Sequence, residues 1–408
     1  MKSETQTGLL IPGTSNMRPV TLVDAADVAG VRDALRAALN ENGPAVLVHD
    51  ARAVRLSGAG EVDIAEVDED IAVLVHTSGS SGTPKTVVLS SAALRSSADA
   101  AHERLGGVGQ WLLALPLSYI AGLSVLIRAE VAGIKPAVMH PGPFDPQLFL
   151  ETVATMTGDR KYTSLVPVQL SRVLDFVEDE PEFAAVLQSL DAILIGGQAL
   201  EHDLADRAQA AGVHIVTTYG SSETSGGCVY DGIPLSGVEV VTDQATQEIL
   251  ISGPMSATGY LGNDELTQDK FQIRNGSRWY RTGDAGSYQD GVLSVTGRLD
   301  RVIISGGLKV SLDAVEAAVT QLQGYAAAVA VNIPDSEWGV RPGVVVEGIP
   351  QDDDVARAEI YDGIVRELGR VAAPKVIVFV PSLPRLSSGK PDFQVCADIA
   401  QTAATAER

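Results

Sequence analysis

Strand-like and helix-like runs alternate through the first half of this chain, from residue 44 to residue 220. "WLLALPL" (111–117) and "AILIGG" (192–197) have the composition of buried strands, and "LEHDLADRAQAAG" (200–212) has that of a helix. Helical periodicity also predicts a helix over residues 22–40. Such alternation is typical of mostly parallel sheets covered by helices. We therefore expect an α/β fold, in which ligands bind at the carboxyl ends of the strands.

The pattern changes at about residue 229, where short strands and turns begin to dominate. Segments such as "EILISGP" (248–254) indicate a small antiparallel or β-barrel-like subdomain. A further α/β section begins at about residue 301 and contains a helix at 311–322. We predict a large N-terminal domain over residues 1–298 and a smaller, mobile α+β C-terminal domain over residues 301–408.

Charge and cysteine content narrow the classes of protein. The 408 residues include 30 Lys and Arg against 52 Asp and Glu, a net charge of −22. This balance argues against binding nucleic acid or anionic membranes, because both require basic surfaces. The two cysteines, Cys228 and Cys396, form no disulfide framework or metal-ligand spacing. Neither a signal peptide nor a membrane-spanning stretch is evident, so we expect a soluble cytoplasmic protein without membrane insertion.

Residues 77–85, "TSGSSGTPK", form a polar, glycine-rich loop between two apolar strand-like runs, 71–76 and 86–90. Exposed backbone N–H groups and hydroxyls in such a loop can donate to phosphate oxygens. The loop is not a Walker motif, because Pro84 stands directly before Lys85 where that motif has Gly. Taken alone, the pattern fits a flexible Ser/Gly turn equally well.

Two more polar clusters follow strand-like runs, "IGGQAL" (195–200) and "TTYGSSET" (217–224). Both lie where a ligand of an α/β sheet would bind. Tyr219 offers a ring that can stack on a base, and Glu223 is a hard oxygen ligand suited to Mg²⁺ beside phosphates. The simpler interpretation of the second cluster is a capped helix start, with Glu in the first turn.

Three clusters in the second half of the chain also carry polar groups. Asp284, in "WYRTGDAG" (279–286), can accept hydrogen bonds from ribose hydroxyls, and Arg298 can hold a hydroxyl or a phosphate. A salt bridge in a turn is the alternative for this pair. "SGGLKVS" (305–311) has a glycine pair before a strand, which permits close approach of a thin ligand. Lys390 stands alone in a loop, where a lysine is normally solvated.

Several catalytic motifs are absent from the sequence. It has no G-x-S-x-G nucleophile elbow, no G-x-G-x-x-G and no H-E-x-x-H. The six histidines are scattered, so structural or surface roles are the default for each of them: 49, 76, 102, 140, 202 and 214.

In order and spacing, these clusters resemble the signatures of the adenylate-forming superfamily, which contains acyl- and aryl-CoA ligases, luciferases and peptide-synthetase adenylation domains. The resemblance covers residues 70–408. "TSGSSGTPK" is similar to its phosphate loop, and "YGSSET" to its Y-G-x-T-E segment, with Ser222 in place of the usual Thr. "YRTGD", "GRLDRVIISGGLKVSLDAVE" and "PRLSSGK" match three further signatures. Each motif is weak alone, but five in the right order are specific.

Three segments, 115–129, 163–174 and 192–201, are similar to the o-succinylbenzoate–CoA ligases of menaquinone biosynthesis. Two departures stand out. The phosphate loop begins at residue 77, so the resemblance implies a shortened N-terminal subdomain. Tyr119 stands where such ligases usually carry His, at a position that flanks the acyl carboxylate and the pantetheine channel.

The resemblance implies two steps: a carboxylate and ATP give acyl-AMP and pyrophosphate, and coenzyme A then displaces AMP. It implies ATP, Mg²⁺ and coenzyme A as ligands and a small aromatic acid as substrate. The implied phosphate-binding residues are Thr77, Ser78, Gly79, Ser80, Ser81, Gly82, Thr83 and Lys85. The remaining nucleotide-binding residues are Gly196, Gly197, Gln198, Thr218, Tyr219, Gly220 and Ser222 around adenine, and Asp284 and Arg298 at the ribose. Glu223 and Thr77 would hold Mg²⁺.

The resemblance also assigns roles to the C-terminal domain. Lys390 would bridge the carboxylate and the α-phosphate, making it catalytic together with Glu223 and Lys85. Asp300 would be the hinge, and rotation about it would bring Gly306 and Gly307 to the pantetheine channel.

For the acid we expect a pocket formed by Tyr119, Arg128, Gly197 and Ser222. We name Arg128 because a dianionic acid inside an acidic protein requires a local cation. Two alternatives stay open at this point: a CoA ligase for another aryl or acyl acid, and a non-catalytic nucleotide-binding regulator. A homodimer is one assembly compatible with the sequence.

Overall fold

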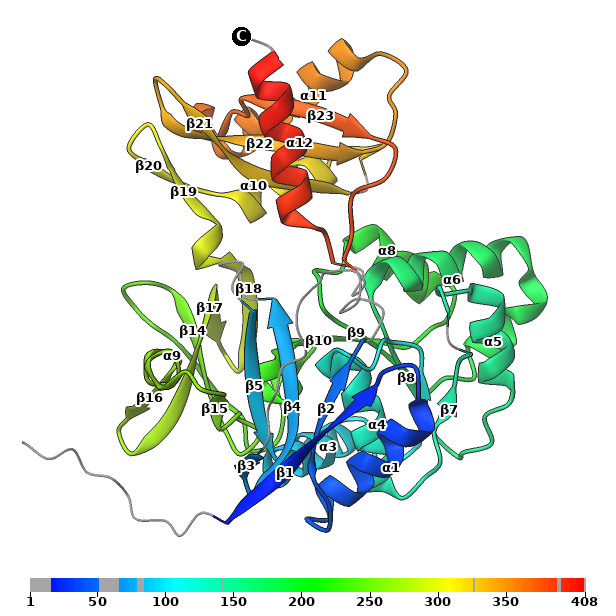
Figure 1. Cartoon of the computed structure of the whole chain (residues 1–408). Helices are drawn as coiled ribbons and strands as arrows, with labels where there is room; N and C mark the ends of the chain where they lie inside the picture. Colours follow the sequence, from blue (N-terminus) through cyan, green and yellow to red (C-terminus); the bar gives the residue numbers. More distant parts are fainter. Residues whose placement is uncertain are drawn as a thin grey trace, which may run out of the picture.

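The structure is a computed structural model that describes residues 16–50, 66–78, 84–140, 142–325, 327–386 and 390–406. Figure 1 shows a large body and a smaller one, joined where β18 (Val292–Arg298) leads into β19 (Val302–Ser305). The strands up to β18 form three sheets, and the strands from β19 onward form a fourth. The α/β class and the arrangement of a large and a small domain are confirmed.

The first sheet has the order β15-β5-β4-β2-β1-β3. Residues 22–40 are not one helix as we predicted, because β1 takes Met17–Asp24 and pairs in parallel with β2. The helix begins only at Val28, where the Asp27 side chain accepts a hydrogen bond from the Gly30 N–H. The elements of this region are β1 (Met17–Asp24), α1 (Val28–Leu39), β2 (Ala45–His49), β3 (Glu66–Asp68), β4 (Ile71–Ser78), β5 (Pro84–Ser90) and β15 (Gly259–Tyr260).

The second sheet has the order β12-β11-β10-β9-β8-β6-β7, and its strands from β10 to β7 are parallel. Its strands are β6 (Gln110–Leu113), β7 (Ala137–Val138), β8 (Lys161–Leu165), β9 (Ala192–Ile195), β10 (Ile215–Ser221), β11 (Gly226–Tyr230) and β12 (Ile233–Pro234). Its helices are α3 (Ser91–Arg104), α4 (Ile120–Ala132), α5 (Pro146–Ala154), α6 (Pro167–Asp179), α7 (Ala184–Leu187) and α8 (His202–Ala210). Leu112, Leu165, Ile193 and Phe149 are buried in the core between sheet and helices.

The third sheet is antiparallel, as the short strands and turns predicted, with the order β13-β14-β17-β16 and with β18 paired to β17. Its elements are β13 (Glu239–Thr242), β14 (Glu248–Ser252), α9 (Asp264–Lys270), β16 (Phe271–Arg274), β17 (Ser277–Gln289) and β18.

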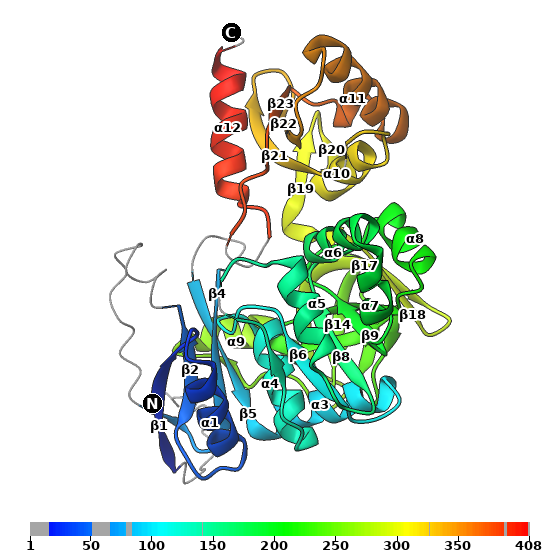
Figure 2. The same ribbon diagram turned by 90° about the vertical axis from the view of Figure 1, so that its right-hand side faces the viewer.

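The fourth sheet has the order β20-β19-β22-β21, with β23 paired to β22. It comprises β19, β20 (Leu308–Ser311), β21 (Ala328–Asp335), β22 (Gly339–Glu347) and β23 (Val376–Val380). The helices α10 (Leu312–Thr320), α11 (Asp353–Leu368) and α12 (Phe393–Ala406) pack on it. Figures 1 and 2 show the segment before α12 descending from this sheet toward the larger body.

Parallel strands bring the predicted polar clusters to one edge. β8, β9 and β10 are neighbours in register, so the residues that follow Leu165, Ile195 and Thr217 lie side by side. Within the described part of the chain, no helix is both long and apolar enough to span a bilayer.

Candidate active site

Three side chains meet just after the end of β10. Two of them, Lys85 and Glu223, were predicted from the sequence, and the third, Tyr260, was not. The Lys85 ammonium donates to Glu223 Oε1 at 2.6 Å, and the Tyr260 hydroxyl donates to the same oxygen at 2.9 Å. Lys85 also lies over the Tyr260 ring, 4.6 Å from its centroid. Burial alone would raise the pKa of Glu223, but the charge and hydrogen bond of Lys85, together with hydrogen bonds from the backbone and Tyr260, hold this pKa below its ordinary value. The group therefore presents an ionised carboxylate beside a cation.

Backbone pairing explains how these three side chains meet. Lys85 is the second residue of β5 and pairs with Thr77 across the β4–β5 hairpin, while Tyr260 in β15 pairs with Val87 on the other side of β5. Glu223 lies in a short 3₁₀ turn (Ser222–Thr224) that follows β10, and its backbone carbonyl accepts from the Ala257 N–H at 2.8 Å.

Most of the predicted phosphate loop lies outside the described residues, namely Gly79, Ser80, Ser81, Gly82 and Thr83. Thr77 ends the described stretch of side chains, and its hydroxyl donates to the Lys85 carbonyl at 3.4 Å. Ser78 closes β4 opposite Pro84 in the ladder. Lys85, at the C-terminal end of the loop, therefore contacts Glu223, and Thr77 at the other end pairs with Lys85.

A second polar group lies between β10 and the third sheet. The Tyr219 hydroxyl donates to Asp284 Oδ2 at 2.7 Å, and the Arg298 guanidinium donates to Asp284 Oδ1 at 2.8 Å. Arg298 also donates to Asp300 at 2.9 and 3.0 Å. Burial raises the pKa of Asp284 above its ordinary value, although the bonds from Tyr219 and Arg298 oppose this. The predicted ribose pair is therefore assembled, and its geometry is also that of the salt bridge we held as the alternative.

The strand-end glycines allow close backbone approach. A Cβ on Gly196 would stand 2.4 Å from Thr218 Oγ1, and one on Gly220 would stand 2.1 Å from the Gly226 carbonyl oxygen. Thr218 Oγ1 donates to the Ile195 carbonyl at 3.2 Å, which ties β10 to the end of β9. Gln198 follows these glycines as a half-buried residue on the same edge.

Lys390 reaches this edge from the C-terminal part of the chain. Its Cε lies 3.8 Å from the position that a Cβ on Gly197 would occupy. The loop is held as a hairpin-like turn, in which the Leu386 N–H donates to the Lys390 carbonyl at 2.8 Å. The side chain keeps contact with solvent, yet surrounding atoms and then Arg298 lower the pKa of its ammonium, while Asp284 and Glu223 oppose them. Lys390 thus lies within electrostatic range of Asp284 and of Glu223, the partner of Lys85, although these residues lie far apart in the sequence.

Comparison of the sequence with family models identifies the family of this chain. A family model described as AMP-binding enzyme matches residues 14–261, and its C-terminal domain model matches residues 314–390. The chain belongs to the AMP-binding enzyme family.

Relatives of known name narrow the comparison. The chain is 38% identical to the probable 2-succinylbenzoate–CoA ligase of Mycobacterium tuberculosis, over 92% of this chain and 96% of that protein. It is 30% identical to the 2-succinylbenzoate–CoA ligase of Enterococcus faecalis, over 79% of this chain and 68% of that protein. Among solved structures, the o-succinylbenzoate coenzyme A synthetase of Bacillus subtilis in complex with AMP matches with a TM-score of 0.68 and 25% identity. That match covers 86% of this chain and 74% of the other.

In this AMP-binding enzyme, Gly306 and Gly307 lie away from the group around Lys390. They form the β19–β20 turn, which Figure 1 shows at the outer side of the smaller body. A Cβ on Gly306 would meet the Trp338 ring at 2.6 Å, whereas nothing lies within 4 Å of one on Gly307. The present arrangement therefore brings Lys390 to the site and leaves the glycine pair outside it.

The structure does not bring Arg128 to the site. It is buried in α4, donates to the Tyr230 hydroxyl at 3.2 Å and lies 4.9 Å from the centroid of the Trp111 ring. Trp111 lies near the amino end of β6, whereas Gly197 and Glu223 follow the carboxyl ends of β9 and β10. We therefore withdraw Arg128 from the acid pocket. α4 begins at Ile120 beside the site and is directed away from it, so Arg128 lies about two turns distant.

Two other acid-pocket residues do lie at the correct edge. Tyr119 follows β6, precedes the first residue of α4 and is half-buried. Ser222 is buried in the 3₁₀ turn beside Glu223. Val166 also lies at this edge, with its Cγ1 3.7 Å from the Cβ position of Gly197, and no motif in the sequence indicated it.

The donor set at Glu223 suits Mg²⁺ held together with a nucleotide. Mg²⁺ is usually bound by one or two carboxylates plus substrate phosphates, so it needs no cage made of protein alone. The described residues contain no cluster of three His, Cys, Asp or Glu. A single ionised Glu223, in contact with Lys85, agrees with that mode of binding.

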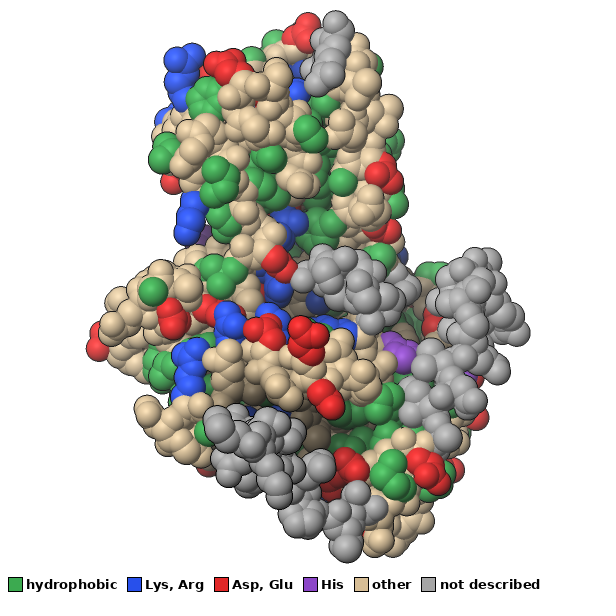
Figure 3. Space-filling model, turned by 60° about the vertical axis from the view of Figure 1, so that its left-hand side comes forward, with side chains coloured by type: hydrophobic (Ala, Val, Ile, Leu, Met, Phe, Trp, Pro, Cys, Tyr) green, Lys and Arg blue, Asp and Glu red, His purple; other side chains and the backbone are tan. Residues whose placement is uncertain are grey.

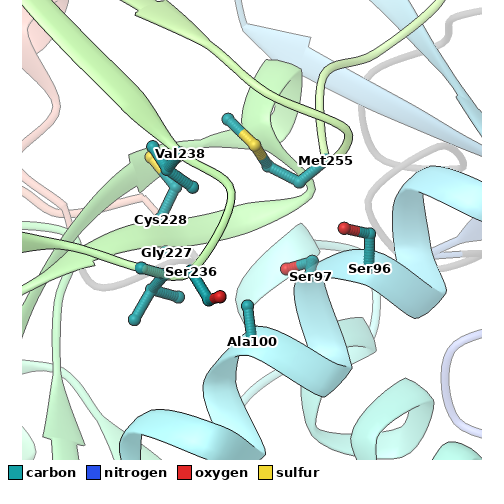
Figure 4. Close-up of a pocket in the computed structure, with 9 residues that line it drawn as sticks. Ser96, Ser97, Ala100, Gly227, Cys228, Ser236, Val238 and Met255 are labelled. Atoms are coloured by element: carbon teal, nitrogen blue, oxygen red, sulfur yellow. The ribbon is translucent and has the colours of Figure 1, made fainter.

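A crevice away from this edge has no room for a ligand. It lies between α3 and the strands around Cys228 and Met255, and small side chains such as Ser97 and Ala100 line it (Figure 4). It cannot admit even a water molecule.

Proposed function

We propose that the chain is an ATP-dependent o-succinylbenzoate–CoA ligase, which forms an acyl-AMP intermediate and then a CoA thioester. One observation carries the assignment: Lys390 from the C-terminal part meets Glu223, Asp284 and Gly197 at the strand ends of an AMP-binding enzyme. The identity of 38% to the M. tuberculosis ligase along almost its whole length supports the choice of acid.

In the first step, a carboxylate oxygen of the acid attacks the α-phosphorus of ATP, and the bond to pyrophosphate breaks. Lys85 neutralises the outer phosphates, and Lys390 stabilises the charge that develops between the carboxylate and the α-phosphate. Mg²⁺, when bound, neutralises phosphate charge beside Glu223. Asp284 accepts from the ribose hydroxyls and is held in place by Tyr219 and Arg298.

In the second step, the thiol sulfur of coenzyme A attacks the acyl carbon, AMP leaves, and the thiol proton is lost. We propose that residues 301–408 rotate about Asp300 between the two steps. That rotation would remove Lys390 and bring Gly306 and Gly307 to the pantetheine channel. One site would then serve two transition states by exchanging its electrostatic donors.

A panel of acids tests the assignment, with pyrophosphate release measured with and without coenzyme A. We expect o-succinylbenzoate to give the highest kcat/KM. Higher turnover with benzoate or a fatty acid would instead support a ligase for another acid, which Tyr119 in place of the usual His leaves as the second candidate. Binding of ATP without AMP release under every condition would indicate a regulator, although a regulator has no need of Lys390 and Glu223.

Two further expectations concern the setting of the enzyme. We place it in the cytoplasm, where ATP and coenzyme A are available and where its two free, buried cysteines would stay reduced. A homodimer stays a prediction, and light scattering on the purified chain would test it.

A further inference from the structure

One carboxylate contacts the backbone and side chains on both sides of the proposed hinge. Asp313 is the second residue of α10, and its Oδ2 accepts from the backbone N–H of Arg298 at 2.6 Å. Its other oxygen, Oδ1, pairs with the Arg301 guanidinium. Asp300 lies between these two contacts along the chain, in a short 3₁₀ turn (Leu299–Arg301).

The two contacts belong to different parts of the molecule. Arg298 ends β18 and pairs with Asp284 in the third sheet, so it belongs to the large domain. α10 packs through Leu312, Val315 and Val319 into the core of the fourth sheet. A rotation about Asp300 would therefore separate Asp313 from the Arg298 N–H.

The Arg301 contact would survive that rotation. The Arg301 guanidinium also pairs with Glu316 of α10 and donates to the Ala330 carbonyl at 3.1 Å, so it is anchored within the C-terminal part. It lies 4.2 Å from the centroid of the Phe393 ring as well. Of the two contacts of Asp313, only the bond from the Arg298 N–H would be lost in that rotation.

The residue before Arg298 makes this approach possible. A Cβ on Gly297 would stand 2.5 Å from Asp313 Oδ2 and 3.0 Å from Asp313 Cβ. A side chain here would therefore displace the carboxylate. The backbone at Gly297 has a φ of +142°, which also disfavours other residues.

We propose that Asp313 is a positioning residue that latches the C-terminal domain in the arrangement that places Lys390 at the site. The latch acts through the Arg298 backbone, next to the guanidinium that holds Asp284. This inference rests on the proposed two-step function and on the proposed rotation. It adds the residue that sets the balance between the two domain arrangements.

The expected effect is a change in the ratio of two populations. A hydrogen bond to a charged group is worth enough to shift a two-state equilibrium by about tenfold or more. If the domain exchanges rapidly, the rate of each half-reaction follows the fraction of the chain in the matching arrangement. The ratio of the thioester-forming rate to the adenylate-forming rate should therefore rise about tenfold when the bond is lost, whichever arrangement dominates.

The test measures both half-reactions in single turnover. Asp313→Ala should raise that ratio about tenfold, whereas Asp353→Ala, an exposed carboxylate at the start of α11 in the same domain, should leave it unchanged. Asp313→Asn keeps the size of the side chain and serves if the alanine variant does not fold, and it should shift the ratio in the same direction by a smaller factor. A ratio unchanged in both Asp313 variants would overturn the latch.

A distance measurement separates this inference from the proposed function. Spin labels on Gln209→Cys in α8 and Gln401→Cys in α12 report the separation of the two domains, because both positions are exposed and both native cysteines are buried. Asp313→Ala should increase the fraction of the distance that AMP and coenzyme A favour. If Asp313→Ala shows this second distance in the same fraction of molecules as the parent does, the latch is refuted and the rotation is not. A single distance under every condition would refute the rotation and the latch together, whatever acid the enzyme uses.

Discussion

Replacing Lys390 by Ala should strongly slow acyl-AMP formation and spare the transfer to coenzyme A. The ammonium is the one described cation that the C-terminal part extends beside Gly197, and Asp284 and Glu223 lie close enough to influence its pKa. Two opposite unit charges about 4 Å apart, at an effective dielectric constant of about 20, interact by about 4 kcal/mol. That energy corresponds to about 10³ in rate. Because Lys390 keeps contact with solvent, we expect a loss of about 10²–10³ in acyl-AMP formation, the range found for single electrostatic donors.

The assay measures pyrophosphate release in the first half-reaction and thioester formation from supplied acyl-AMP in the second. Lys390→Ala should retain the second rate within about twofold, because the proposed rotation would have removed the ammonium from the site by then. Lys135→Ala, an exposed lysine near the amino ends of the parallel strands, should leave both rates intact. Gly307→Leu should show the opposite split, with normal pyrophosphate release and slow transfer to coenzyme A. Equal damage to both half-reactions by Lys390→Ala would refute the rotation and favour a static site.

Three other predictions concern buried charges. Lys85→Ala and Glu223→Ala should each slow pyrophosphate release about 10²–10³-fold, and near-normal release in both would return "TSGSSGTPK" to a simple Ser/Gly turn. Arg128→Met should lower the Tm and leave the KM for o-succinylbenzoate unchanged, because Arg128 packs between Trp111 and Tyr230; a raised KM at an unchanged Tm would contradict this. Burial, and then Arg128, lower the pKa of His102 to about 4. The unfolded chain, with a His pKa of about 6.5, therefore takes up this proton first as the pH falls, so stability should drop by about 3 kcal/mol between pH 6.5 and pH 4. Denaturant titration at both pH values measures the free energy of unfolding, which should fall less with pH in His102→Gln than in the parent. An equal fall in both proteins would contradict a lowered pKa of His102.

The sequence predicted the strand-end residues well because parallel strands leave little freedom there. Once β8, β9 and β10 are neighbours, the residues after Ile195 and after Thr217 must share one edge. Glycines at this edge also mark close backbone approach, since a Cβ on Gly220 would collide with the backbone of Gly226. The motifs that carry the resemblance are thus the ones whose geometry depends on local sequence.

Residues that meet only through tertiary packing could not be predicted in this way. Tyr260 reaches Glu223 because β15 adds to the edge of the first sheet, a pairing of strands about 170 residues apart. No pattern in "ATGYLG" (257–262) predicts that pairing. The prediction that Arg128 lines the acid pocket was wrong because net charge does not indicate which way a helical side chain points. The strand β1 was missed because residues 22–24 fit a helical period while Leu22 pairs with Leu47 in the sheet.

An enzyme with a net charge of −22 must still bind ATP, which is itself a polyanion. Local cations are therefore needed to offset the negative electrostatic potential of the protein. Figure 3 shows Lys and Arg side chains interspersed with Asp and Glu where the smaller body meets the larger one. Lys85 is paired with Glu223, and Arg298 with Asp284 and Asp300. These pairs hold the cations in position before the nucleotide arrives, so ordering them costs less when it binds. In the proposed binding mode, the phosphates would compete with Glu223 for the Lys85 ammonium. Mg²⁺ bound together with ATP would favour this exchange, because it would neutralise the Glu223 carboxylate that Lys85 leaves. In that mode, Arg298 would undergo the same exchange at the ribose end of the nucleotide. Because its backbone N–H also donates to Asp313, this one residue would couple occupation of the ribose site to the position of the C-terminal domain.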